Sequence, residues 1–287
     1  MAAVTIPIHT RRHRQQPSQS NRVEATTNQD GRDPKLEKPN PPFKDFYSLF
    51  GGSLPDASSI LVSGDPGSGK TTLAQQILYD ELCRLKPCII ITYDTFPSNI
   101  IERMKEFGWD PKKYQSMNKL DFVDCYSATA GITEGVVPQP FDLTSVSIYL
   151  TAVMERLGNR DITIVLDSLI PIFSETESKH AISFIQSIAA KVKKAGGKLI
   201  LTLSTGSVHP ELFHKVESLV DGVVELRMVE EGQMLRRYLL VRKMDRRHIT
   251  PRLVQFDIIG GRGIQLKLSR IGLLWRRSGL SHPAPKN

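Results

Sequence analysis

A glycine-rich segment constrains this chain more than any other feature. It matches the pattern GxxxxGK[ST] at every required position, and it lies between a short apolar run, 60–62, and a stretch whose apolar residues have helical spacing. Glycines let backbone N–H groups curl around phosphates, and the start of the following helix adds its positive end. The pattern therefore predicts a phosphate-binding loop between a strand and a helix. Its residues are Gly64, Asp65, Pro66, Gly67, Ser68, Gly69, Lys70 and Thr71.

Two side chains of this loop carry specific chemistry. Lys70 provides a mobile positive charge for the β- and γ-phosphates of a nucleotide. The hydroxyl of Thr71 is expected to ligate Mg²⁺, which also bridges phosphate oxygens. Thr72 follows at the start of the helix and completes the predicted nucleotide-binding set. The predicted ligand is thus a nucleotide with its magnesium ion.

Apolar strand-like runs alternate with amphipathic stretches from residue 42 onward, which predicts a parallel sheet covered by helices on both faces. After Val220 the pattern changes to strands joined by short turns, with a hairpin at 230–232. We therefore expect one α/β domain over 42–268, with a C-terminal antiparallel β-meander that extends one edge of the sheet. The expected strands are 60–62, 88–92, 120–124, 162–166, 198–203, 223–229, 236–243, 253–258 and 264–268; the expected helices are 72–85, 97–107, 143–157 and 178–195.

Two aspartates follow strands at the edge where ligands bind in open α/β sheets. Asp167 ends the run 164–166, a pattern typical of a carboxylate that holds Mg²⁺ through water, although an aspartate there can also be a cap or turn residue. Asp94 closes the strand 88–93 and is our candidate to position or deprotonate an attacking water. A helix cap ahead of Pro97 is the alternative role. Thr202 and Ser204, at another strand end, are further candidates to contact the γ-phosphate.

The basic charge of the chain is concentrated at its ends. Of the formal net charge of +8, residues 1–41 hold seven Lys/Arg against four Asp/Glu, residues 269–287 hold four against none, and 42–268 hold 27 against 26. A nearly neutral body disfavours an extended nucleic-acid surface, while the tails leave such binding open. Residues 1–41 contain few large apolar side chains and are expected to be a disordered basic and polar extension; an organellar transit peptide is the alternative. Residues 269–287 form a basic tail.

Apolar runs and cysteine content indicate which cellular compartment to expect. The sequence has no apolar run of the ~18 residues that a membrane span needs, and no secretion signal is recognisable. Its three cysteines contain no CxxC motif and cannot all pair. A reduced, cytoplasmic protein without a membrane segment is the expectation.

The motifs together resemble the KaiC-like branch of the RecA superfamily, as a single-domain member covering about residues 46–268. The resemblance implies a RecA-like fold and an ATPase that binds MgATP. The lead-in 49–55 is similar to "GGxLP", 107–110 to "FGWD", and 166–168 to a Walker B "DS". Residues 221–226, 242–244 and 256–258 resemble the family's terminal β-meander.

The resemblance also implies partners. In that family ATP sits at subunit interfaces, and a lysine and an arginine from the neighbouring subunit approach the γ-phosphate. Lys243 matches the lysine, which makes it a candidate catalytic residue together with Lys70 and Asp94. Asp245 stands where the arginine is expected, with Arg246 or Arg247 as substitutes if the turn is shifted.

A second departure bears on the reaction. Asp94 and Thr95 occupy the place of two adjacent glutamates, so the carboxylate is one methylene shorter. A slow ATPase that forms homo-oligomers and regulates assembly or a protein partner is the leading hypothesis. A nucleotide-binding module with weak or no turnover is the first alternative. A RadA- or RadB-like DNA-recombination accessory ATPase is the second, although residues 168–177 contain no Lys or Arg for a DNA-binding loop.

Overall fold

Six strands of the central sheet run parallel, and three more extend it antiparallel. The computed structural model describes residues 43–132 and 138–268, which belong to one compact unit. Their strand order is β3-β2-β4-β5-β1-β6-β7-β8-β9, antiparallel from β6 to β9. The predicted α/β architecture with a C-terminal meander is thereby confirmed; the proposed extension 1–41 and tail 269–287 lie outside the described residues. The strands are β1 Ser58–Gly64, β2 Cys88–Thr92, β3 Leu120–Asp124, β4 Thr163–Asp167, β5 Lys198–Ser204, β6 Gly222–Glu231, β7 Met234–Met244, β8 Leu253–Ile259 and β9 Gly263–Leu266.

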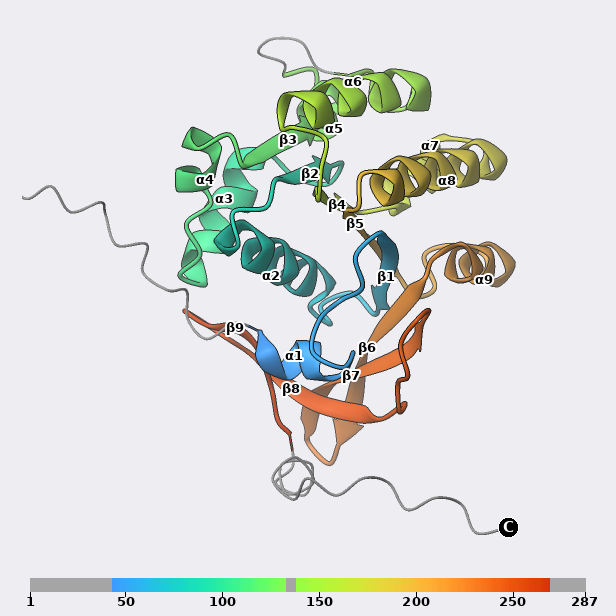
Figure 1. The fold of residues 1–287 in the computed structure, drawn as a ribbon. Coiled ribbons are helices and arrows are strands. Elements are labelled where there is room, and N and C mark those ends of the chain that lie inside the picture. Colours follow the sequence, from blue (N-terminus) through green and yellow to red (C-terminus); the bar gives the residue numbers. More distant parts are fainter. Residues whose placement is uncertain (1–42, 133–137, 269–287) are drawn as a thin grey trace, which may run out of the picture. The chain divides into compact units, whose positions relative to one another are not determined.

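Helices cover both faces of the parallel part of the sheet (Figure 1). Helices α2 and α3 lie on one face, while α6 and α8 lie on the other. The helices are α1 Lys44–Ser48, α2 Lys70–Cys83, α3 Pro97–Glu106, α4 Lys112–Ser116, α5 Cys125–Thr129, α6 Leu143–Arg156, α7 Ile170–Glu175, α8 Ser178–Lys194 and α9 Pro210–Leu219. In the described part of the chain, no helix is both long enough and apolar enough to cross a bilayer.

The core has two halves because successive residues of a strand point to opposite faces of the sheet. In β1, Ile60 and Val62 pack with α1, α2 and the meander, whereas Leu61 packs with α6 and α8. All seven residues of β1 are buried. Burial on both faces explains why this strand appears in the sequence as a continuous apolar run rather than an alternating pattern.

Asp221 fastens the meander to the parallel sheet. Its carboxylate accepts hydrogen bonds from the amide and hydroxyl of Ser59, both at 2.7 Å, and pairs with Lys193 Nζ at 2.7 Å. Burial acts to raise the pKa of Asp221, but the bonds from Lys193 and Ser59 outweigh it and hold this pKa below its usual value. The start of β6 is thus locked to the start of β1.

We expect Asp221→Asn to lower the free energy of unfolding by about 1–3 kcal/mol at neutral pH, because a charge-assisted network is replaced by neutral hydrogen bonds. Since the folded-state pKa lies below the unfolded value, the carboxylate stabilises the fold above the unfolded pKa and loses this effect as the pH falls through the folded one. Urea unfolding should therefore show a difference in stability between the two proteins at neutral pH, and this difference should narrow as the pH falls below about 4, the ordinary pKa of an aspartate. A gap independent of pH would contradict this account.

Candidate functional site

The predicted phosphate-binding loop joins β1 to α2 and is shaped by its glycines. Gly64, Gly67 and Gly69 have φ angles of 148°, 78° and 105°, which residues with a side chain rarely adopt. A Cβ atom on Gly64 would lie 2.2 Å from the Leu226 carbonyl oxygen on β6. The loop therefore folds tightly against the neighbouring strand, and Lys70 begins α2 directly after it.

Lys70 lies across the mouth of the loop. Its Nζ donates hydrogen bonds to the backbone carbonyls of Gly64 and Asp65, each at 2.9 Å. Burial lowers the pKa of Lys70, while the negative charges of Asp167 and Asp65 act in the opposite direction. The ammonium group thus lies in a partly desolvated place where a phosphate could replace the two carbonyls as its partner.

The interior of the loop is built for polar groups of a ligand. Ser68 is fully buried, yet its Oγ has no hydrogen-bond partner among the described residues. Asp65 accepts a hydrogen bond from Thr205, which directly follows β5. Thr71 and Thr72 follow in the first turn of α2 and are half-buried. An unpartnered hydroxyl in a glycine cradle at a helix start fits a phosphate group.

Asp167 ends β4, two strands from the loop in the sheet, and its side chain is turned toward it. The Thr202 hydroxyl donates to Asp167 Oδ1 at 2.5 Å. Burial raises the pKa of Asp167 and the nearby Asp94 raises it further, whereas hydrogen bonds from Thr202 and Thr71 lower it. The two residues predicted to hold magnesium, Thr71 and Asp167, therefore lie near one another. Thr202, our further candidate to contact the γ-phosphate, holds the Asp167 carboxylate.

Asp94 lies beside Asp167 because β2 and β4 pair in register, Thr92 with Asp167. Its Oδ2 accepts a hydrogen bond of 2.7 Å from the buried Ser168 hydroxyl, and the rest of the side chain is exposed. Phe96, not Asp94, occupies the N-cap of α3, and it makes no side-chain capping bond. The geometry of Asp94 thus matches a carboxylate held at the sheet edge rather than a helix cap.

Lys243 does not reach this site within the same chain. It pairs with Val223 on β6, which pairs with Leu61, three residues before Gly64 on β1. Three residues of strand correspond to about 10 Å, toward the opposite edge of the sheet. The Lys243 ammonium donates to the Val220 carbonyl at 2.6 Å, and its side chain is 38% exposed.

Two contacts of the loop were not expected from the sequence. Thr205 bonds to Asp65, and Arg237 of β7 places its Nε 3.4 Å from the Gly67 carbonyl oxygen. The position of Thr205 just after an apolar strand is a signal that could have identified it. Arg237 carries no such signal, because its approach depends on how the meander folds over the loop.

A separate cavity of about 500 Å³ lies between α6 and the α7–α8 region. It is lined by residues such as Ser147, His180 and Phe184. None of its lining residues belongs to the phosphate-binding loop or to the sheet edge that carries Asp94 and Asp167. The cavity is therefore separate from the predicted nucleotide site.

Comparison with protein families places this geometry in a known group. Residues 43–270 match the family described as "ATPase: KaiC". The chain belongs to the KaiC ATPase family. It therefore carries a nucleotide-binding ATPase domain of the RecA type, as the resemblance of its motifs implied.

Similar proteins come from archaea and cyanobacteria. The chain is 31% identical over 218 residues to the UPF0273 protein PH0284 of Pyrococcus horikoshii, which covers 73% of this chain and 86% of that protein. It is also 31% identical over 203 residues to the circadian clock oscillator protein KaiC of Prochlorococcus marinus, covering 69% of this chain but 39% of the relative. Among solved structures, the KaiC-like protein PH0186 of Pyrococcus horikoshii matches with a TM-score of 0.65 at 25% identity, covering 78% of this chain and 95% of that one.

Proposed function

We propose that this KaiC-family domain binds MgATP in its phosphate-binding loop and hydrolyses it slowly, at a site that a second copy of the chain completes. The observation that carries the proposal is the meeting of four groups at one sheet edge. The Lys70 ammonium, the Thr71 hydroxyl and the carboxylates of Asp167 and Asp94 converge there from α2, β4 and β2. Phosphate binding, metal binding and activation of water need these groups together.

Nucleotide binding is assigned to Gly64–Thr72. The backbone N–H groups of the loop and the start of α2 would bind the phosphates, and Lys70 would exchange its two carbonyl partners for phosphate oxygens. Ser68 supplies a buried hydroxyl that lacks a partner among the described residues. ATP rather than GTP is proposed because of the family, since the sequence contains no guanine-reading NKxD motif.

The donor set also fits magnesium. Thr71 would ligate the ion directly, and Asp167 would hold it through water; hydroxyl and carboxylate oxygens are the ligands that Mg²⁺ prefers. When bound, the ion would neutralise negative charge on the phosphates. Thr202 keeps the Asp167 carboxylate oriented, which is the usual task of the partner of a metal-binding residue.

Asp94 is assigned as the group that positions or deprotonates the attacking water. It is a carboxylate on the exposed side of Asp167, and Ser168 fixes its orientation. It is one methylene shorter than the glutamate of the family pattern, and one of its oxygens is already engaged by Ser168. A displacement near 1 Å can cost about 10²-fold in rate, which is why slow turnover is proposed.

The location of Lys243 supports completion of the site by a neighbouring subunit. A lysine level with Leu61, three residues of strand before Gly64, and with its ammonium bonded to Val220 does not serve the loop of its own chain, but a head-to-tail neighbour would bring it to the next loop. A DNA-recombination role is less favoured, because 168–177 carries no Lys or Arg and folds largely as the short helix α7.

The test measures phosphate release from saturating MgATP across a series of protein concentrations. We expect the rate per subunit to rise with concentration and to vanish in Lys70→Ala. Lys70→Ala and Lys243→Ala should each be nearly inactive, while their mixture should regain activity, because the first offers an intact Lys243 and the second an intact loop. Lys215→Ala, which removes an exposed lysine on α9, serves as the matched control.

Each outcome decides one part of the proposal. Restoration on mixing supports an interface site, whereas a rate independent of concentration, with no gain on mixing, contradicts it. A wild-type rate no higher than that of Lys70→Ala, with MgATP still bound, contradicts hydrolysis. That result would instead support the alternative function, a nucleotide-dependent switch without turnover.

A further inference from the structure

The turn that follows β7 is held by a contact between two distant segments. Arg246 has a left-handed backbone, with φ of 62°, which is uncommon for a residue with a side chain. Its guanidinium Nη2 donates to two successive carbonyl oxygens, Asp56 at 3.0 Å and Ala57 at 3.1 Å. Arg247 donates from Nη2 to Ser53 Oγ at 3.3 Å. We call Arg246, Arg247 and the segment 53–57 the turn clamp.

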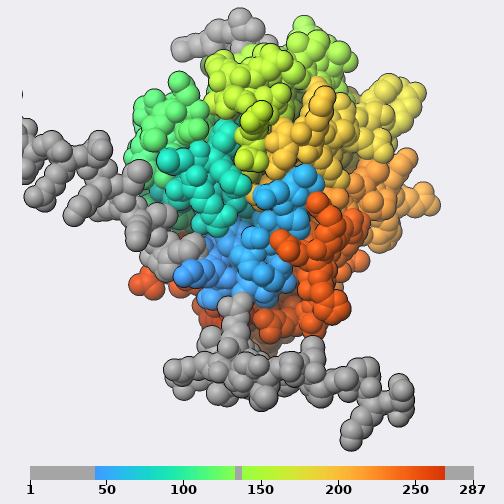
Figure 2. All heavy atoms as spheres, viewed as in Figure 1, coloured from blue at the N-terminus to red at the C-terminus, as the bar shows by residue number. Residues whose placement is uncertain are grey.

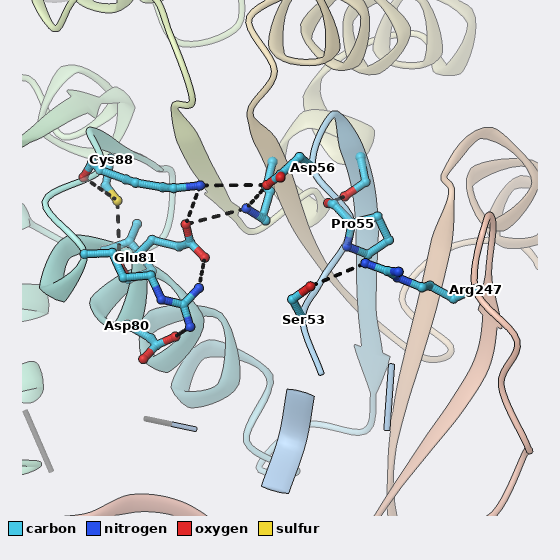
Figure 3. Close-up of polar contacts among 12 residues, drawn as sticks. Ser53, Pro55, Asp56, Asp80, Glu81, Cys88 and Arg247 are labelled. Atoms are coloured by element: carbon cyan, nitrogen blue, oxygen red, sulfur yellow. Dashed lines mark hydrogen bonds and ion pairs between the residues drawn. The ribbon is translucent and has the colours of Figure 1, made fainter. Parts of the chain in front are cut away.

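The figures show the two halves of the clamp side by side. In the space-filling view, the blue residues near the start of the described chain lie against the orange residues after β7 (Figure 2). In the close-up, Arg247 reaches from the meander to Ser53, while Asp56 faces the opposite way, toward Glu81 (Figure 3). The segment 53–57 is therefore held by polar contacts on two sides.

The far side of this segment is anchored in the interior. Asp56 Oδ1 pairs with Lys198 Nζ at 2.7 Å, and Lys198 also lies 3.5 Å from Glu81 Oε2 at the end of α2. The side chains of Lys198 and Glu81 are only 5% and 1% exposed. The hydrogen bond from Lys198 holds the pKa of Asp56 below its usual value, so the carboxylate stays charged. A segment fixed to buried charges gives Arg246 a rigid support.

Lys243 lies three residues before Arg246, and the chain between them is fixed as well. The Asp245 amide donates to the Asp221 carbonyl at 2.8 Å, and Lys243 Nζ donates to Val220 at 2.6 Å. Both guanidinium groups bond to the segment 53–57 of their own chain, so Arg246 and Arg247 hold the turn to that segment.

We propose that Arg246 is a positioning residue that acts through Lys243 on the nucleotide of the adjacent subunit. This inference rests on the proposed function, since it requires Lys243 to serve a neighbouring loop. By holding the turn to 56–57, Arg246 fixes the chain directly after Met244, where β7 ends, and with it the position of Lys243 one residue earlier. Displacement of that lysine by about 1 Å would reduce turnover on the order of 10²-fold at the neighbour's site, and at no other.

The test uses Arg246→Gly, because glycine adopts a positive φ without strain and only the guanidinium is lost. MgATP affinity should stay within about twofold of wild type, as the loop of the same chain is untouched, while phosphate release per subunit falls at least about 10-fold. Arg246→Lys keeps the positive charge but has a single ammonium group, so its rate of phosphate release should lie between those of wild type and Arg246→Gly. Arg252→Gly is the matched control, since among the described residues Arg252 is exposed and makes no side-chain hydrogen bond or ion pair.

Mixing distinguishes positioning in trans from a merely structural role. In an equal mixture of Arg246→Gly and Lys70→Ala, the intact loops belong to the Arg246→Gly subunits. Half of the neighbours of these subunits are Lys70→Ala subunits with a wild-type turn, so the rate per intact loop should return to about half the wild-type rate. No gain on mixing, or equal loss of affinity and rate in Arg246→Gly, overturns the inference. If wild type shows no turnover, or if Lys70→Ala and Lys243→Ala do not complement each other, the proposed function itself fails. If Lys70→Ala is complemented by Lys243→Ala but not by Arg246→Gly, only the role of Arg246 is refuted.

Discussion

Lys70→Ala is expected to reduce MgATP affinity by at least about 100-fold, because it removes a charge-assisted contact to phosphate from a partly desolvated position. Within 43–132 and 138–268, the Lys70 ammonium bonds only to two carbonyls of its own loop, both at 2.9 Å. Those bonds are weaker than a bond to an anionic phosphate, so nucleotide binding draws the lysine away from them. Equilibrium binding of a fluorescent ATP analogue, displaced by ATP, measures the loss.

Two comparisons exclude a general effect of lost charge and a loss of folding as explanations. Lys194→Ala removes an exposed lysine from α8 and should leave affinity unchanged. The melting temperature without nucleotide should change little in Lys70→Ala, because the mutation leaves the glycine cradle in place. A change in affinity of less than about threefold would mean that phosphate binding depends on other groups of the loop, since a lost charge-assisted contact costs more than that.

The strands were predictable because each depends on local sequence. The run 88–92 is short and mostly apolar, and 120–124 is short with apolar residues at 120, 122 and 123; the structure places β2 and β3 at those bounds. Helices with a clear apolar period, such as α6 and α8, were predicted to within one residue at either end. The fold of the parallel sheet and its meander therefore follows from patterns that can be read within a few residues.

Shorter helices carried too little signal. The five-residue helices α1, α4 and α5 contain little more than one turn, so no apolar period can establish itself. Helix α9 has ten residues, but only Val216 among them is fully buried. These helices are stabilised by packing against the rest of the fold, and a single sequence does not show which residues they contact.

The candidate site, too, was predictable from the sequence only in part. The phosphate-binding loop, Asp167 and Asp94 could be placed because each follows a strand, and the ends of parallel strands meet at one edge. The contacts that orient them, Ser168 to Asp94 and Arg237 to Gly67, join residues 74 and 170 positions apart. The clamp at Arg246 joins residues about as distant. Such pairings arise from tertiary packing, so the roles of these residues had to come from the structure.

Asp94→Asn is expected to lower the turnover number by about 10²-fold or more while MgATP affinity stays near wild type, because the amide retains the shape of the side chain but cannot accept a proton. The Asn oxygen can still accept the hydrogen bond from Ser168, so the sheet edge keeps its geometry. Single-turnover phosphate release, with affinity measured in parallel, separates the two effects. Asp110→Asn is the control, since Asp110 is exposed in the connection between α3 and α4 and caps the Lys112 amide at 3.1 Å.

Asp94→Glu tests whether the length of this side chain limits the reaction. A longer side chain moves the carboxylate outward by one methylene, beyond the place where Ser168 holds it in the wild type. If the wild-type carboxylate falls short of the water, Asp94→Glu should turn over faster than wild type, because alignment within a fraction of an ångström governs such steps. A slower variant would mean that the bond from Ser168 already places Asp94 where the water lies. Slow turnover would then originate elsewhere, and Asp245, which reverses a charge near Lys243, becomes the next residue to change.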